Sequence, residues 1–237
     1  MIKEALQYIV GLKAPVVQKI DGQTYSDKEL KRINYTPYAE PLYMSTLTSL
    51  VEYIKSNTDK LPEKILLHVV SPTRVVLVGN LDNDRVRENI AVVDAMLPEF
   101  YFGRFIDNEE FVISLQSKFI DSHDRALVLK FAGTVEVGSV QEYGDDGVSQ
   151  KASVKTGIAS KSDAIVPNPV TLVPYRTFHE VEQPESQFIF RMRSEHGVQC
   201  ALFEADGGAW KASAMENIRF YLAQELKDCA VKHTVIS

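Results

Sequence analysis

Ionisable side chains gather in two stretches of the chain that flank an aromatic hairpin pattern. The first stretch is the proline-rich segment 165–184, and the second is the loop EADGGAW at 204–210. If the first stretch folds over the hairpin, its charges meet those of the loop and could exchange protons or clamp a phosphate. The side chains that would meet are Arg176, His179, Glu180, Arg191, Arg193, Glu204 and Asp206. The candidates for a catalytic role among them are Arg176, His179, Glu204 and Asp206.

The same residues also fit a purely structural interpretation. Glu204-Ala-Asp206 followed by two glycines is typical of a turn between a strand and a helix. Arg191 and Arg193 are two residues apart, so in a strand they share its polar face. No serine lies in a G-x-S-x-G elbow, and the histidines are few and scattered. The sequence therefore favours a non-enzymatic protein over an enzyme.

Two cysteines and two histidines have the residue types of a zinc site. His196 precedes Cys200 by four residues, and Cys229 precedes His233 by four. Cys200 lies in an expected strand, where residues four apart are separated by about 13 Å, too far for one tetrahedral zinc ion. Gly207-Gly208 is too short for a phosphate loop and lacks the Lys-Ser/Thr ending. We therefore expect no metal and no cofactor.

Four prolines shape the segment that carries Arg176, namely Pro167, Pro169, Pro174 and Pro184. Each fixes φ, removes a backbone donor and pushes the preceding residue out of the α region, so the segment is expected to be extended and irregular. A rigid loop of this kind presents a surface to a partner. The expected binding residues are Tyr175, Arg176, Phe178, His179 and Glu180.

Composition limits the classes of protein and of partner. The chain has 237 residues, of which 45% are hydrophobic and 24% charged, enough for one large core or two modest ones. Its net charge of −6 repels polyanions, which disfavours nucleic acid as a partner. No apolar run approaches the roughly 20 residues of a membrane span, so we expect no membrane contact. Two cysteines in so long a chain indicate a reducing cytoplasm rather than a disulfide framework.

Apolar spacing and turn signals predict the helices and strands. Helices are expected over 2–11, behind Ser45 and Thr46, behind Asp107, over 123–132 with Gly133 as its end, and from a Ser213–Glu216 capping box onward. Strands are expected as hairpins in 14–26, 134–157 and 187–205, as a meander over 65–97, and at 231–237. These blocks indicate an α+β fold with antiparallel sheets, as a meander and hairpins, packed with four to five helices. We expect two α+β regions, 1–120 and 121–237, as separate domains or as one continuous domain.

The segment from Thr134 to Leu226 resembles the YfdQ-like family of bacteriophage and prophage proteins. The resemblance rests on VEVGSVQEYGDDGVSQ (135–150), VPNPVTLVPYRTFHEVEQPESQFIFRMR (166–193), ALFEADGGAW (201–210) and the closing helix. It implies an accessory protein of a temperate phage in the host cytoplasm, and it supplies no catalytic residues that can be carried across.

These observations together predict a phage-encoded accessory binding protein that acts as a homo-oligomer. A host or phage protein is the expected further partner, and the expected role is to modulate host defence or phage DNA metabolism. Strand edges and a rigid loop offer surfaces for self-association and partner capture. Two alternatives stay open, namely an enzyme that acts on a nucleotide or nucleic acid, and a virion structural or assembly protein.

Overall fold

The computed structural model describes residues 2–11, 15–20, 22–28, 38–82, 85–137, 140–145, 150–156, 160–166, 168–193 and 197–237. The fold is α+β, as the sequence predicted. The chain divides into two units, Met1–Tyr38 and Ala39–Ser237. Among the described helices, none combines the length and the apolar character that a bilayer crossing requires.

The first unit holds a helix and a hairpin, both expected from the sequence. Helix α1 covers Ile2–Gly11. Strands β1 (Val17–Ile20) and β2 (Gln23–Ser26) pair antiparallel, and Gly22 between them has a φ of 80°, the left-handed value that favours glycine in such turns. Asp21, the other residue of the expected turn, lies outside the described residues.

One sheet of the second unit has five strands in the order β14-β4-β5-β6-β3. The meander predicted over 65–97 forms its centre, with β4 (Lys64–Ser71), β5 (Arg74–Leu81) and β6 (Arg87–Asp94) in antiparallel pairs. The sheet as a whole is mixed, because β14 (Lys232–Ile236) runs parallel to β4 and β3 (Leu42–Met44) runs parallel to β6. Helices after β3 and before β14 let the chain cross the sheet, which parallel neighbours require.

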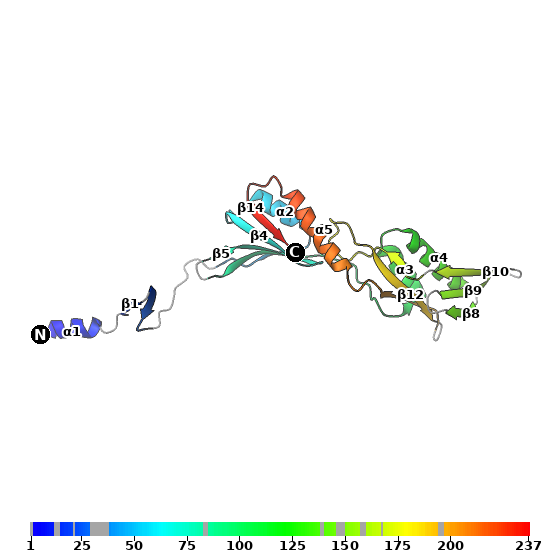
Figure 1. The fold of residues 1–237 in the computed structure, drawn as a ribbon, viewed down its shortest axis with the longest axis horizontal. Coiled ribbons are helices and arrows are strands. Elements are labelled where there is room, and N and C mark those ends of the chain that lie inside the picture. The colour runs from blue at the N-terminus through cyan, green and yellow to red at the C-terminus, as the bar shows by residue number, and fades with distance from the viewer. Residues whose placement is uncertain are drawn as a thin grey trace. The chain divides into compact units, whose positions relative to one another are not determined.

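Helices α2 (Leu47–Ser56) and α5 (Trp210–Glu225) lie together on one face of this sheet (Figure 1). The Thr46 side chain caps α2 by accepting from the Ser49 N–H, as predicted. Both helices and alternate positions of the central strands contribute to a first core, which includes Leu50, Ile54, Leu67, Leu77, Val93, Phe178, Ile218 and Leu222. This face is therefore fully used for packing.

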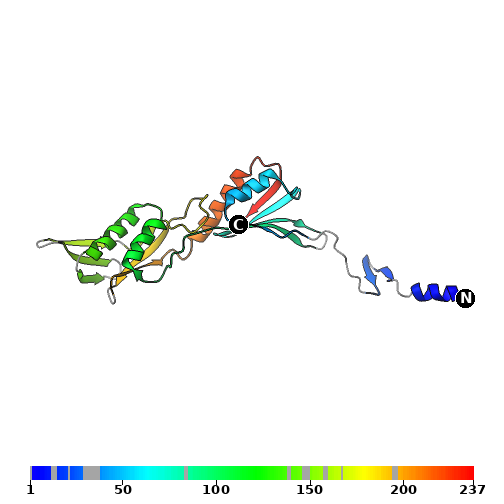
Figure 2. The ribbon, with the colours of Figure 1, turned by 180° about the vertical axis from the view of Figure 1, so that it is seen from behind.

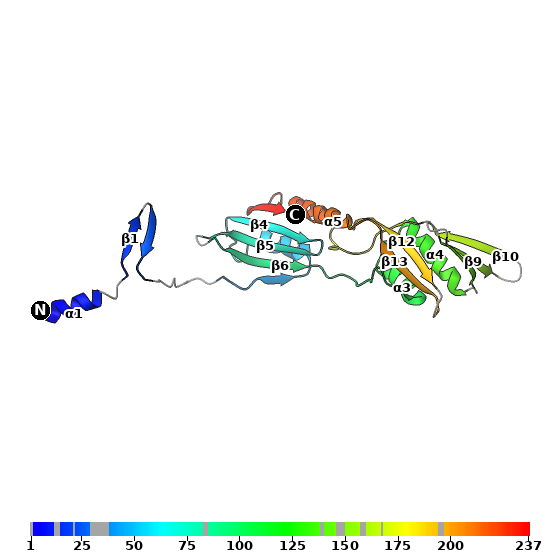
Figure 3. The same cartoon turned by 60° about the horizontal axis from the view of Figure 1, so that its bottom comes forward.

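The opposite face of the five-stranded sheet, which we call the outer face, is apolar at its centre and is turned toward the viewer in Figure 3. Side chains paired across neighbouring strands point to the same side, so the register and the alternation of burial define this face. Its apolar members are Tyr43, Leu66, Val70, Val76, Val78, Val92 and Ile236, and the same register adds the polar residues Lys64, His68, Arg74, Asn89, Asp94, Lys232 and Thr234. No described helix or strand of residues 39–237 lies over it (Figures 1 and 3).

A second sheet of the same unit has the order β11-β12-β13-β7. The hairpin predicted in 187–205 is confirmed as β12 (Ser186–Arg193) with β13 (Gln199–Glu204), flanked by β11 (Val170–Leu172) and β7 (Ile106–Asp107). Ser194 and His196 of its turn lie outside the described residues. Helices α3 (Asn108–Ser117) and α4 (His123–Val137) cover one face of this sheet (Figure 2). The second core between them includes Phe111, Leu115, Phe131, Phe188, Phe190, Cys200 and Leu202.

Two helix boundaries differ from the prediction, one at Gly133 and one at Ser213. α4 continues past Gly133 to Val137, because one glycine weakens a helix by only about 1 kcal/mol and the adjacent Phe131 and Ala132 are packed in the core. α5 begins at Trp210, so Ser213 lies inside the helix and does not open it. The Asp107 side chain caps α3 as predicted, by accepting from the Glu109 N–H at 2.9 Å.

A third sheet follows α4 and was predicted only in part. The expected hairpin pairs β8 (Val140–Asp145) with β9 (Gln150–Thr156), and β10 (Ser160–Val166) adds a strand that the sequence did not indicate. Residues 146–149 of the expected turn lie outside the described residues.

Strand pairing runs across the domain boundary expected between residues 120 and 121. β14, from the C-terminal region, completes the sheet of β4, while β7, from the N-terminal region, pairs with β13. The two expected regions therefore share both large sheets.

Candidate functional site

The irregular segment 173–185 joins β11 to β12 and carries most of the expected site residues. It contains no helix, as its prolines predicted, and Pro167 lies outside the described residues. The Gln183 side chain holds it in shape, since its Oε1 accepts from the N–H groups of Arg176 and Thr177 at 3.0 and 3.1 Å. The Thr177 hydroxyl donates to the Pro72 carbonyl at 2.6 Å. The segment is thereby fastened to the turn between β4 and β5.

Arg176 projects from this segment into the space between β12, β13 and the start of α5. Its side chain is only 7% exposed, and Nη1 donates to Glu204 Oε1 at 2.6 Å while Nη2 donates to the Ser186 hydroxyl. The guanidinium carbon lies 4.0 Å from the centroid of the Trp210 ring, a stacked cation–π contact. The proline-rich segment thus folds over the hairpin, as the cluster hypothesis required.

Asp206 organises the turn that leads from β13 into α5. Its Oδ1 accepts from the Gly208 N–H at 3.0 Å, and the carboxylate also accepts from the Ser186 hydroxyl and the Trp210 N–H. Gly207 and Gly208 have φ values of 63° and 82°, so both glycines are required by the backbone. Ala209 at the N-cap position has no side chain that could cap, so Asp206 supplies the acceptor from outside the helix.

The electrostatics of the cluster keep its groups in their ordinary charge states. Burial is the main cause that lowers the pKa of Arg176 to about 10, although the charges of Glu204 and Asp206 oppose the shift. Partial burial opposes ionisation of Asp206, but hydrogen bonds from Ser186, Gly208 and Trp210 and the charge of Arg176 hold its pKa below the usual value. Arg176 therefore keeps its proton at pH 7 and Asp206 keeps its charge. Neither group is poised to exchange a proton, and the cluster serves to tie three segments together.

Other residues of the expected site lie elsewhere. His179 is exposed and its ring lies 5.1 Å from that of Tyr175, while Glu180 Oε1 accepts from the Thr48 N–H at the start of α2. Phe178 is 1% exposed and belongs to the first core, so it presents no surface, contrary to the expectation for the loop. Of the other arginines, Arg191 donates to the Phe190 carbonyl and Arg193 stacks over the Phe105 ring at 4.2 Å. Only Arg176, Glu204 and Asp206 are brought together.

The two cysteines considered for zinc belong to different cores. Cys200 is buried in the second core, where its Sγ–H donates to Asn108 Oδ1 at 3.2 Å and burial raises its pKa to about 12. Cys229 packs against the first core, and His233 Nδ1 lies 3.0 Å from the Val231 carbonyl oxygen. His196 lies outside the described residues. Within the described ranges, no three His, Cys, Asp or Glu side chains are grouped as metal ligands would be.

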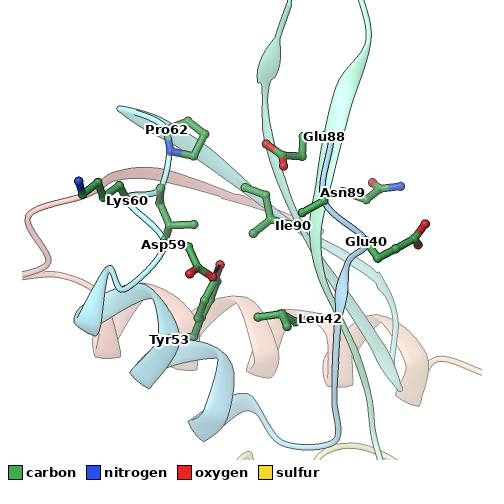
Figure 4. A pocket seen from close by; sticks show the side chains of 11 residues that line it. Glu40, Leu42, Tyr53, Asp59, Lys60, Pro62, Glu88, Asn89 and Ile90 are labelled. Atoms are coloured by element: carbon green, nitrogen blue, oxygen red, sulfur yellow. Dashed lines mark hydrogen bonds between the residues drawn. The ribbon is translucent and has the colours of Figure 1, made fainter. Parts of the chain in front are cut away.

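A separate pocket of about 370 Å³ lies between α2, the turn after it and β6 (Figure 4). Tyr53 and Asp59 point toward each other in it, and the phenol donates to Asp59 Oδ2 at 3.0 Å. Burial, followed by this hydrogen bond, raises the pKa of Tyr53 to about 12. Leu42 and Ile90 give the pocket an apolar wall, and Glu40 lies at its rim. Its central polar groups already satisfy each other.

Sequence reasoning missed two residues of the Arg176 cluster. Ser186 joins Arg176 to Asp206, and Gln183 shapes the loop from inside. The alternation Ser186-x-Phe188-x-Phe190 places Ser186 on the buried face of β12, and that period could have revealed a buried hydroxyl. No sequence pattern predicts the role of Gln183, because its amide is buried by the path of the loop and not by the periodicity of a strand or helix.

No protein-family model, curated protein or solved structure matches the chain.

Proposed function

We propose that this protein is a non-enzymatic binding module that works as a homodimer, in which the outer face of one copy packs against the outer face of a second. The phage-accessory context and a location in the host cytoplasm are part of the proposal. They are supported by the sequence resemblance to the YfdQ-like family and by the low cysteine content. A role in host defence or phage DNA metabolism would be exercised through a further protein partner.

The observation that carries the proposal is the apolar character of the outer face. A sheet that faces water on one side normally alternates apolar and polar positions, with the polar ones outward. Here the outward positions of the central strands are instead Leu66, Val76, Val78 and Val92. Tyr43 and Ile236 extend the same surface to the edge strands and are 77% and 41% exposed, and Val70 near the end of β4 is 45% exposed. An apolar surface of this kind marks an interaction site.

The size of the outer face suits a second copy. The strands β14, β4, β5, β6 and β3 contain 5, 8, 8, 8 and 3 residues. With about 3.4 Å per residue and about 4.8 Å between strands, the face covers roughly 500 Å² in plane. Two such faces together reach on the order of 1,000 Å², which is near the lower bound for a specific interface. Face-to-face packing of two sheets about 10 Å apart is a common way to bury them.

Two ion pairs neutralise charges at the ends of the outer face. Arg74 and Asp94 form a bidentate ion pair at one end, with distances of 2.6 and 2.9 Å. Lys232 pairs with Glu63 at 3.0 Å beside the edge strand β14. An identical face brought opposite would meet apolar side chains at its centre and charged and polar side chains at its rim, the usual anatomy of an interface.

The Arg176 cluster supports the non-enzymatic part of the proposal. Arg176 and Asp206 use their hydrogen-bonding groups on Glu204, Ser186 and the start of α5. Their pKa values lie far from neutrality on either side, so they lack the tuning expected of a general acid or base.

The experiment is to disrupt the outer face with charge and measure the mass in solution. Val70→Glu combined with Ile236→Glu changes two exposed outer-face residues, so the fold should survive. By multi-angle light scattering at micromolar concentration, the wild-type chain should have twice the mass of 26.6 kDa, and the double variant should have that mass once.

A matched control uses two apolar residues on helices that are at least as exposed. Ile113→Glu with Phe220→Glu introduces the same charges at positions that are 57% and 60% exposed, on α3 and α5. This control should remain dimeric. If instead both double variants dissociate, or neither does, the outer face is not the contact.

A further inference from the structure

A cavity beside Trp210 has the properties of a binding site for a small ligand. This cavity of about 260 Å³ opens between the segment 97–102, the proline-rich segment and the first residue of α5. Aromatic rings make up much of its wall, contributed by Phe100, Phe102, Tyr175 and Trp210. The cavity holds one ring or a fused pair of rings, because drug-sized pockets start at about 300 Å³.

The aromatic wall is held in place from behind. The rings of Phe100 and Phe102 lie 4.8 Å apart in an edge contact, and Phe102 stacks on Phe188 of the second core at 5.1 Å. Phe100 also meets Phe119 at 5.1 Å. Because these partners are buried, the wall keeps its shape when no ligand is bound. A planar apolar group would find rings arranged for offset or edge contacts.

Two hydrogen-bond donors at this cavity lack an acceptor. Arg176 Nε and Trp210 Nε1 are buried and have no hydrogen-bond partner among the described residues. Both residues line the cavity, and they stack on each other at 4.0 Å. A buried donor without an acceptor is unfavourable, so a small shift of either side chain toward the cavity would be favoured where an oxygen of a bound group accepts from it. The missing acceptor thus points to a ligand that carries oxygen.

The charges of the cavity favour an acidic ligand. Lys118 and Arg176 contribute two cations to the wall, of which Arg176 is also paired with Glu204 at 2.6 Å, and Glu99 contributes the one carboxylate among its described residues. Glu99 is exposed and is occupied by a hydrogen bond from the Tyr101 phenol. An oxyanion beside Lys118 and Arg176 would form charge-assisted hydrogen bonds.

We infer that this cavity binds a small aromatic anion, a planar ring that carries a carboxylate or a phosphate, with the ring among Phe100, Phe102 and Trp210 and the oxyanion toward Arg176 and Lys118. The inference does not depend on the homodimer, because no residue of the cavity belongs to the outer face. A carboxylate or phosphate on such a ring would come from an aromatic acid or from a nucleotide.

The test uses the fluorescence of Trp210, which is the chain's only tryptophan. Benzoate is the probe for an aromatic carboxylate and adenosine monophosphate the probe for a nucleotide. Benzamide and adenosine are their uncharged counterparts. At least one anionic probe should change the Trp210 emission with a saturable curve, and its uncharged counterpart should bind about tenfold more weakly, the factor for one lost charged contact. The probe that saturates identifies the source of the oxyanion.

Two lysine variants separate the cavity from its surroundings. Lys118→Met removes a cation from the cavity and should weaken the anionic probe about fivefold or more. Lys211→Met removes a cation that lies 6.0 Å from the same indole ring but does not line this cavity, and it should leave binding unchanged. The inference fails if neither anion saturates up to about 10 mM, where even weak ligands of this size bind. It also fails if the uncharged probes bind equally well, or if the two lysine variants behave alike.

Discussion

Replacing Asp206 with alanine tests whether this carboxylate holds the turn before α5 together. The substitution removes the acceptor for the Gly208 and Trp210 N–H groups and the partner of the Ser186 hydroxyl. Loss of a helix cap costs about 0.5 to 2 kcal/mol, and a lost hydrogen bond to a charged group costs about 1.5 to 3 kcal/mol. Because these terms overlap, we expect a loss of about 2 kcal/mol in the free energy of unfolding.

The assay is thermal and chemical unfolding followed by circular dichroism. For a chain of this size, about 2 kcal/mol should lower Tm by roughly 4 to 8 °C. Asp206→Asn keeps an oxygen acceptor but loses the charge beside Arg176, so it should lose clearly less than the alanine variant. Asp121→Ala removes an exposed aspartate that pairs with Arg125 on the surface, and it should stay within about 0.5 kcal/mol of wild type.

The reasoning would be refuted by an Asp206→Ala variant no less stable than Asp121→Ala. That result would mean that the turn is held by its backbone alone. If Asp206→Asn lost as much as Asp206→Ala, the charge rather than the acceptor would hold the turn.

Four further outcomes follow from the same contacts. Trp210→Ala should lower the free energy of unfolding in urea melts by about 3 kcal/mol, because the ring stacks on buried Arg176. The control Phe220→Ala lies at an exposed site on α5 and should change this free energy by less than about 0.5 kcal/mol. The pKa of Asp206 is lowered in the folded state, so its contribution to stability is fully present above the unfolded pKa of about 4 and is lost as the pH falls below that value. The difference in unfolding free energy between wild type and Asp206→Asn should therefore be constant from about pH 5 to 8 and should shrink below about pH 4. A difference that grows in acid would contradict the assignment. Cys200 is buried with a pKa of about 12 and should react with a thiol reagent only when the protein unfolds, while partly exposed Cys229 should react in the native state. The Cys200→Ala and Cys229→Ala variants each keep one thiol, and equal reaction rates of the two native variants would refute this. Gln183→Ala should cost about 2 kcal/mol, since the N–H groups of Arg176 and Thr177 lose their shared acceptor, and a loss below about 0.5 kcal/mol in urea melts would show that the loop is held by other contacts.

Local signals in the sequence predicted elements whose residues act on their neighbours in the chain. The Thr46 and Asp107 caps and the hairpin at Gly22 formed as predicted, because each depends on a few adjacent residues. Ser213 has the spacing of a capping box, but Gly207 and Gly208 turn the chain earlier and Asp206 supplies the cap. A capping signal can thus be overruled by a stronger turn a few residues upstream.

Long-range pairing could not be predicted from local patterns. The parallel neighbours β14 and β3 come from opposite ends of the second unit, and nothing in their short sequences specifies which strand they join. The same limit explains the candidate site. Proline spacing predicted a rigid loop and EADGG predicted a turn, but the meeting of Arg176 with Glu204 depends on how the whole segment packs. The apolar outer face, by contrast, is visible only once the register assigns Val76 and Val92 to one side.

The mass of the wild-type protein in solution is the most direct test of the proposed function. Sedimentation velocity across a concentration series from about 1 to 50 μM measures this mass over the range in which weak, small interfaces assemble. The outer-face proposal predicts a species of twice the 26.6 kDa chain mass that dissociates when Val70 and Ile236 become glutamate. A wild-type chain that stays at 26.6 kDa throughout the series would contradict it.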